Sequence, residues 1–164
     1  MYRTCVSQYV RAPRSAVYRA LLDPEAVAVW RVPEGMAAQV HAFEAYEGGS
    51  FRVSLTYDDP DGGVGKSVGH TDTYQGHFAE LVPDERVVEV LRFETPDPAL
   101  GGTMTMTTTL CDEADGTRVL LVHEGVPDAV PAADNRAGAR MALAQLARFV
   151  EGRPEGPGRG TQSG

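Results

Sequence analysis

The sequence is short of several residue types, and each shortage limits what the chain can be. Isoleucine is absent, and Lys66 and Asn135 are the only lysine and the only asparagine among 164 residues. This bias toward arginine is typical of a high-GC bacterial genome. With 15 basic and 23 acidic side chains, the formal net charge is −8. Because nucleic-acid binding depends on Lys and Arg contacts to phosphates, we expect no nucleic-acid partner.

Long apolar runs and cysteine pairs are also missing. No run approaches the ~18 apolar residues that a membrane-spanning helix needs, so we expect no membrane span. The N-terminal residues alternate from the start and carry no apolar signal core, which predicts a cytoplasmic protein. Cys5 and Cys111 do not form a Cys-x-x-Cys pair. We expect both to be buried as small apolar side chains.

The four histidines, His41, His70, His77 and His123, lack the spacing of metal ligands, and no cysteine joins them. A phosphate-binding loop, a dinucleotide fingerprint and a Gly-x-Ser-x-Gly nucleophile motif are missing as well. The sequence therefore predicts no metal and no cofactor.

The chain has the length of one domain. We expect this domain to cover residues 1–152. Residues 153–164 contain no apolar side chain that could anchor them to a core. They are predicted to form a disordered C-terminal tail.

Alternating apolar and polar residues predict seven strands, at about 4–11, 38–47, 51–57, 71–81, 86–94, 103–111 and 119–124. Asp115-Gly116 predicts the hairpin turn before the last strand. Two short helical patterns follow the first strand, and the longest helix covers 131–152. This order predicts an α+β helix-grip fold, in which a curved antiparallel sheet wraps around the long C-terminal helix.

Short motifs follow one another in a fixed order along this fold. They read Val-Arg-Ala-Pro at 10–13, Glu-Gly-Gly-Ser-Phe at 47–51, Gly-x-Phe-x-Glu-Leu-x-Pro at 76–83, Asp-Gly-Thr-Arg at 115–118 and Asn-Arg-Ala-Gly at 135–138. Together they resemble the START-like (SRPBCC) superfamily, and within it the family of homologues of the activator of the 90-kDa heat-shock-protein ATPase. The resemblance covers residues 4–151. It implies an apolar cavity between the sheet and the last helix.

Two positions depart from the pattern of that family. Members often carry an aromatic residue after the tryptophan and then Gly-Pro, where this sequence has Arg31-Val32-Pro33. Members also commonly carry tryptophan after the glycine of the last helix, where this sequence has Ala139. Both changes reduce bulk near the place where the helix would cover the cavity.

Residues on apolar strand rows are the candidates for the cavity wall. His123 shares a strand face with Val119 and Leu121, and a polar group on an apolar wall can orient a ligand. The alternative is a histidine whose hydrogen bonds are satisfied by Glu124 or a backbone carbonyl. The predicted cavity residues are Trp30, Phe51, Val53, Tyr57, Tyr74, Phe78, Leu91, Met104, Met106, Leu121, His123 and Leu146.

Glu89 is a further candidate, because it is in phase with Val87 and Leu91 on an apolar strand. A buried carboxylate is costly without a partner, so an inward Glu89 would be a candidate general acid or base. Val88 and Val90 make the opposite face apolar too. The sequence therefore does not determine which faces of strands 71–81 and 86–94 point inward. The alternative to an inward Glu89 is an exposed or paired side chain.

The predicted function is the binding of a small hydrophobic or amphipathic ligand in the cavity. The sequence favours a non-enzymatic ligand-binding protein over an enzyme. The alternative is an enzyme like the polyketide cyclases and aromatases of the superfamily, which need only a shaped pocket and one or two acid–base groups. A chaperone-interacting or stress-response module ranks third. The activators that gave the family its name carry an additional domain, and we expect a chain of this length to have no room for it. The sequence assigns no catalytic residues and does not decide whether the protein forms a homodimer.

Overall fold

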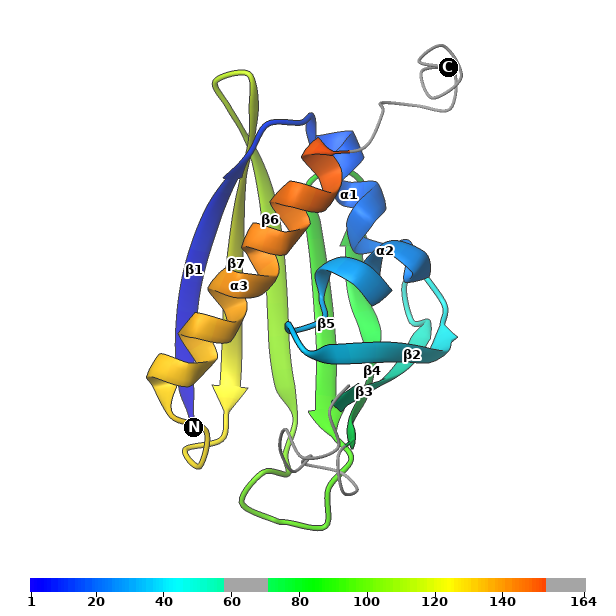
Figure 1. Cartoon of the computed structure of the whole chain (residues 1–164), viewed down its shortest axis with the longest axis vertical. Coiled ribbons are helices and arrows are strands. Elements are labelled where there is room, and N and C mark those ends of the chain that lie inside the picture. Colours follow the sequence, from blue (N-terminus) through cyan, green and yellow to red (C-terminus); the bar gives the residue numbers. More distant parts are fainter. Residues whose placement is uncertain (58–70, 153–164) are drawn as a thin grey trace.

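The computed structural model describes residues 1–57 and 71–152, so His70 and the predicted tail lie outside the described residues. Seven strands and three helices follow the predicted order (Figure 1). They are β1 (Tyr2–Val10), α1 (Arg14–Leu21), α2 (Pro24–Trp30), β2 (Met36–Phe43), β3 (Ser50–Tyr57), β4 (Thr71–Val82), β5 (Arg86–Phe93), β6 (Met104–Glu113), β7 (Gly116–Val126) and α3 (Ala132–Glu151).

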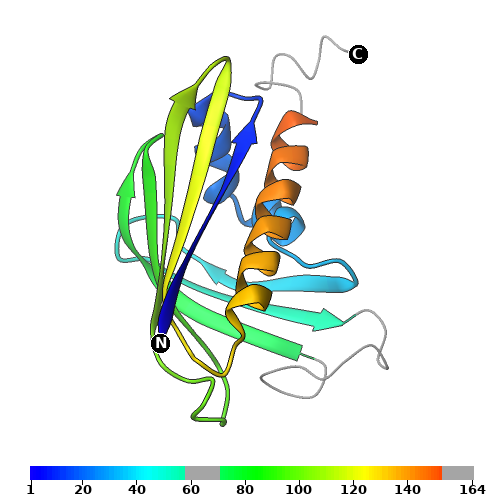
Figure 2. The same ribbon diagram turned by 90° about the vertical axis from the view of Figure 1, so that its left-hand side faces the viewer.

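All seven strands pair antiparallel in one sheet with the order β1-β7-β6-β5-β4-β3-β2. The long helix α3 crosses one face of the sheet diagonally, and α1 and α2 lie on the same side (Figure 1). Figure 2 shows the sheet curving around α3. The predicted α+β helix-grip architecture is therefore confirmed. No helix within 1–57 and 71–152 is long and apolar enough to cross a membrane.

Local sequence signals explain where the short helices begin. Pro13 precedes α1, and Pro24 occupies the first position of α2, where a missing N–H removes no intrahelical hydrogen bond. The Asp23 carboxylate caps α2 by accepting a hydrogen bond from the Glu25 backbone N–H at 2.9 Å. Such a cap satisfies one of the free N–H groups at the helix start.

The core lies between the concave face of the sheet and the helices. From α3, Leu143, Leu146, Ala147 and Val150 are buried. They pack in one cluster with apolar side chains of the sheet and of α1 and α2. The predicted apolar stripe of the last helix is therefore the surface that packs on the sheet.

Both cysteines are exposed, so the prediction that they are buried is wrong. Successive strand residues face opposite sides of a sheet. Cys5 stands between the buried residues Thr4 and Val6 on β1, and Cys111 follows the buried Leu110 on β6. Each cysteine therefore faces the outer side of the sheet, which the helices do not cover.

The turn before β7 also differs from the prediction. Glu113 pairs with Gly116, so the turn consists of Ala114 and Asp115, and Ala114 has a φ of 52°. Gly116 is needed inside the strand, because a Cβ there would lie 2.2 Å from the Val10 carbonyl oxygen. The glycine thus allows the end of β1 to lie close to the start of β7.

Gly138→Ala should stabilise the protein, because Gly138 occupies the interior of α3. A Cβ at this position would meet no atom within 4 Å. Glycine in a helix costs roughly 0.5–1 kcal/mol relative to alanine. We expect the free energy of unfolding, measured with urea, to rise by about that amount. A lower value for the variant would contradict this prediction.

Candidate functional site

A cavity of about 260 Å³ lies between the sheet and α3. Apolar side chains of the central strands form much of its wall, among them Leu91, Met104 and Leu121. On α3, three small residues, Gly138, Ala139 and Ala142, line the cavity between Asp134 and Asn135 on one side and Leu143 on the other. The space therefore exists because the helix presents little bulk where it crosses the sheet.

The predicted cavity residues occupy two places in the structure. Seven of them line the cavity, and ligand contact by these seven stays a prediction. They are Trp30, Tyr74, Leu91, Met104, Met106, Leu121 and His123.

The other predicted cavity residues are not part of the lining. Phe51, Val53, Phe78 and Leu146 lie in the buried core. Tyr57 is half-buried at the end of β3. The residues in the core pack in the same apolar cluster as wall residues such as Tyr74 and Leu91.

Arg31 and Glu89 form a buried ion pair on the cavity wall. Arg31 Nη1 donates to Glu89 Oε1 at 2.7 Å, and the two side chains are 15% and 8% exposed. The guanidinium also stacks over Tyr74, 5.1 Å from the ring centroid. Its Nη2 lies 3.4 Å from the sulfur of Met106. Glu89 thus faces the cavity, which answers the question that the sequence left open.

Hydrogen bonds from α3 hold Arg31 in place. The Nε2 of Gln145 donates to the backbone carbonyls of Trp30 and Val32, at 2.8 Å and 2.7 Å, on either side of Arg31. The indole N–H of Trp30 donates to the carbonyl of Ala20 at 2.9 Å. Trp30 is therefore a packing anchor as well as a wall residue, and the segment that carries Arg31 is fixed to both α1 and α3.

Arg31 keeps its charge in spite of burial. Burial, the largest single influence, lowers the pKa of Arg31, but the charge and hydrogen bond of Glu89 together with Tyr74 outweigh it, so the net shift is upward and the guanidinium stays protonated. Burial raises the pKa of the Tyr74 hydroxyl, which keeps the phenol neutral near pH 7. The pair and the ring together add no net charge to the wall.

His123 receives a hydrogen bond from α3. Asn135 Nδ2 lies 3.0 Å from His123 Nδ1, and the Thr4 hydroxyl donates to Asn135 Oδ1. Asn135 thus takes the place of Glu124 or a backbone carbonyl, the partners that the sequence suggested. Among the described residues, the buried Nε2 of His123 has no hydrogen-bond partner. Burial, aided by the positive charge of Arg31, lowers the pKa of His123 to about 4.

Strand register brings these polar side chains into one row. Glu89 pairs with Met106 across β5 and β6, Met106 with His123 across β6 and β7, and His123 with Thr4 across β7 and β1. Neighbouring strands are about 4.8 Å apart. Since Arg31 bonds to Glu89 and touches Met106, its guanidinium lies close to His123.

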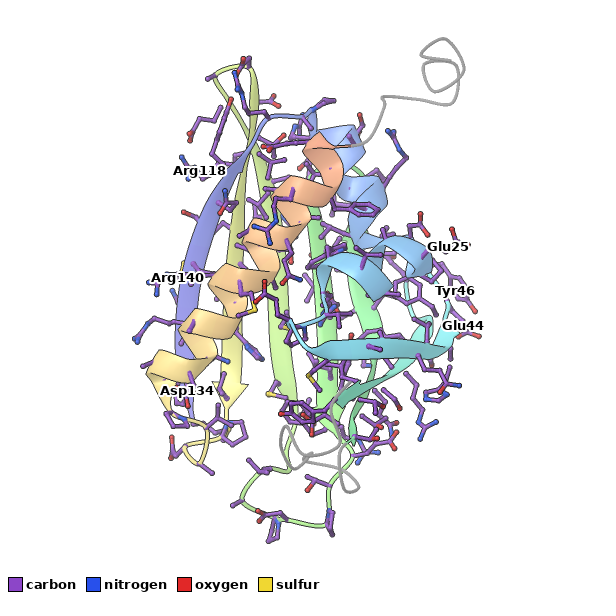
Figure 3. All side chains as sticks on the ribbon, viewed as in Figure 1. Glu25, Glu44, Tyr46, Arg118, Asp134 and Arg140 are labelled. Carbon is purple, nitrogen blue, oxygen red and sulfur yellow. The ribbon has the colours of Figure 1, made fainter. Side chains whose placement is uncertain are left out.

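Exposed residues mark where the cavity reaches the surface. Pro33 and Asp134 are exposed and line the cavity. Figure 3 shows Asp134 near the N-terminal end of α3. Within 1–57 and 71–152, no group of three or more His, Cys, Asp or Glu side chains could hold a metal ion.

A curved seven-stranded antiparallel sheet that grips a long C-terminal helix makes this protein a helix-grip domain of the START-like class. The family model described as Activator of Hsp90 ATPase homolog 1-like protein matches residues 11–151. The chain belongs to this family, which confirms the resemblance found in the sequence.

Solved structures of bacterial proteins agree with this assignment. Protein CV1439 from Chromobacterium violaceum is 32% identical, with a TM-score of 0.80 over 92% of this chain and 99% of that chain. The AHSA1-like protein from Aeromonas hydrophila is 17% identical, with a TM-score of 0.71 over 92% of each chain. The second likeness bears on the fold alone. No curated protein sequence matches the chain.

Proposed function

We propose that the protein binds a small hydrophobic or amphipathic molecule in the cavity between the sheet and α3. The observation that supports this function is the apolar cavity itself, with a volume of about 260 Å³. Ligand pockets commonly measure ~300–1,000 Å³ and combine apolar walls with a few polar groups. This cavity is slightly smaller than the lower end of that range, which favours a ligand the size of one or two fused rings.

The residues around the cavity argue against a simple packing defect. Protein interiors are close-packed, with few voids larger than a water molecule. Larger side chains at Ala139 and Ala142 would fill the space, and both positions lie on a helix face directed at it. The buried ion pair of Arg31 and Glu89 also lines the space. Together with His123, this ion pair forms the polar end of the cavity. Apolar walls combined with a few polar groups are typical of a ligand site.

Ala139→Trp should abolish binding of a neutral apolar dye by filling the cavity. The probe is N-phenyl-1-naphthylamine, whose fluorescence rises in apolar surroundings. We expect stoichiometric binding by the wild type and at least a 10-fold loss of affinity in the variant, since an indole would occupy the dye's space. Met106→Trp should act in the same way from the sheet side.

The matched control is Ala137→Trp, because Ala137 is exposed on the same helix and does not line the cavity. This variant should bind the dye like the wild type. Equal dye binding by wild type, Ala139→Trp and Met106→Trp, all folded by circular dichroism, would show that the dye binds elsewhere. The ligand-binding proposal would then fail.

A second candidate function is catalysis of the polyketide cyclase type in the same cavity. The observation that favours it is the position of Glu89 and His123, which both line the cavity and could move protons. Native mass spectrometry of the protein purified from its own host would separate the two functions. A binder retains one compound unchanged on incubation, whereas an enzyme converts a supplied precursor, and Glu89→Gln would abolish that conversion.

A further inference from the structure

We propose that the ligand of this cavity is an uncharged apolar molecule with a carbonyl oxygen, and that His123 donates a hydrogen bond from Nε2 to that oxygen. The inference rests on the proposed ligand-binding function and names the class of ligand. It follows from three features of the polar end of the cavity: the proton position on His123, its missing partner and the charge balance around it.

Asn135 and Thr4 determine which nitrogen of His123 carries the proton. The Thr4 hydroxyl donates to Asn135 Oδ1, so the amide NH₂ of Asn135 is turned toward His123. An NH₂ group can only donate, and therefore Nδ1 must accept. A neutral imidazole that accepts at Nδ1 carries its proton on Nε2. His123, which lines the cavity, thus carries a donor at its unpaired Nε2 and has no unpaired acceptor.

This donor is buried without a partner in the protein. Among the residues that the structure describes, Nε2 of His123 is the buried side-chain polar atom without a hydrogen bond. Leaving a buried donor unpaired costs more than an ordinary hydrogen bond contributes. A ligand that supplies an acceptor oxygen removes this cost on binding, whereas a hydrocarbon does not.

The charge balance favours an uncharged acceptor over an anion. The positive charge of Arg31 is already neutralised by Glu89 at 2.7 Å. A ligand carboxylate would therefore be a buried charge without its own counter-ion. The exposed Asp134 at the edge of the cavity adds repulsion. A carbonyl oxygen accepts the hydrogen bond without bringing a charge.

The surroundings of His123 fit the rest of such a molecule. Leu121 lies two residues earlier on the same face of β7, and Met106 is the cross-strand neighbour of His123. Both line the cavity. A carbonyl group at His123 would therefore continue into apolar surroundings, as in an aryl or alkyl ketone.

Three naphthalenes of matched size test the inference: 2-acetylnaphthalene with a ketone, 2-ethylnaphthalene without an acceptor and 2-naphthoate with a carboxylate. Affinities come from isothermal titration calorimetry at pH 7.5. We expect the ketone to bind on the order of 10-fold more tightly than the hydrocarbon, as one buried hydrogen bond allows. The carboxylate should bind more weakly than the ketone.

His123→Phe removes the donor and keeps a ring of similar size. This variant should lose the preference for the ketone over the hydrocarbon while it still binds the hydrocarbon. Nitrogen-15 NMR of the wild-type imidazole provides a second readout that needs no variant. It should show a protonated Nε2 and an unprotonated Nδ1, and the Nε2–H resonance should shift with the ketone but not with the hydrocarbon.

The outcomes separate this inference from the function on which it rests. If none of the three naphthalenes binds in the cavity, the ligand-binding proposal fails and the inference fails with it. If the ketone and the hydrocarbon bind equally, or 2-naphthoate binds best, the cavity still binds ligands and only the carbonyl assignment is overturned. A proton on Nδ1 instead of Nε2 would overturn it as well.

Discussion

Glu89→Leu should lower the free energy of unfolding by about 3–5 kcal/mol at pH 7, because it leaves a buried arginine without its counter-ion. Arg31 is only 15% exposed and its Nη1 lies 2.7 Å from Glu89 Oε1. A guanidinium is so basic that Arg31 stays protonated at pH 7 even when the carboxylate is replaced by an isobutyl group. The measurement is urea unfolding followed by circular dichroism.

Replacing both partners should restore most of the loss. In Arg31→Met/Glu89→Leu both charges are replaced by apolar side chains. Replacing a buried ion pair by apolar residues of similar volume often leaves the free energy of unfolding unchanged or raises it. We therefore expect the double variant to unfold within about 1 kcal/mol of the wild type. The interaction energy from the double-mutant cycle then measures the coupling between these two side chains.

Glu113→Gln is the matched control, because Glu113 pairs with Arg118 at 2.7 Å but the two side chains are 45% and 38% exposed. Exposed pairs contribute about 0–1 kcal/mol, so this variant should change stability by less than that. If Glu89→Leu costs no more than Glu113→Gln, the Arg31–Glu89 pair is hydrated and the account of the polar end of the cavity is wrong.

The fold follows from local patterns in the sequence, and for this reason it could be predicted. Alternation with period two gave every strand within a few residues, and the stripe on 131–152 gave the helix that packs on the sheet. The exposed cysteines show the limit of this reasoning. A strand pattern separates two faces, but it does not say that a cysteine is on the face that the helices cover.

The polar end of the cavity depends on contacts between distant parts of the chain, and these could not be read from spacing. Glu89 meets Arg31, 58 residues away, and β5 carries apolar residues on both faces, so its inward side was undetermined. The strand face makes His123 a candidate, but nothing in the spacing of the sequence identifies Asn135 as its partner. Two signals in the sequence point to the pair: a charge at Arg31, next to the tryptophan of a short helix, and a carboxylate on an apolar strand, which requires a cation.

The stability of the protein should fall between pH 7 and pH 4, and His123 should account for up to about 3 kcal/mol of the loss. Burial and the positive charge of Arg31 lower the pKa of His123 from 6.5 to about 4 in the folded protein. At pH 7 the ring is mostly neutral in both states and contributes little to the pH dependence. Between these two pKa values the unfolded chain binds a proton that the folded protein does not. Stability therefore decreases as the pH falls through this window.

His123→Gln isolates this contribution, because glutamine does not titrate. Carboxylates whose pKa is lowered in the folded state, such as Glu80 and Glu94, destabilise both proteins alike in acid. The difference in free energy of unfolding between wild type and His123→Gln at pH 7 and pH 4 thus reports His123 alone. His77→Gln, at an exposed position of β4, should keep the wild-type pH dependence. If the free energy of unfolding depends on pH in the same way for wild type and His123→Gln, His123 is hydrated. Its Nε2 would then donate to water, and the argument for a ligand acceptor at this atom would fail.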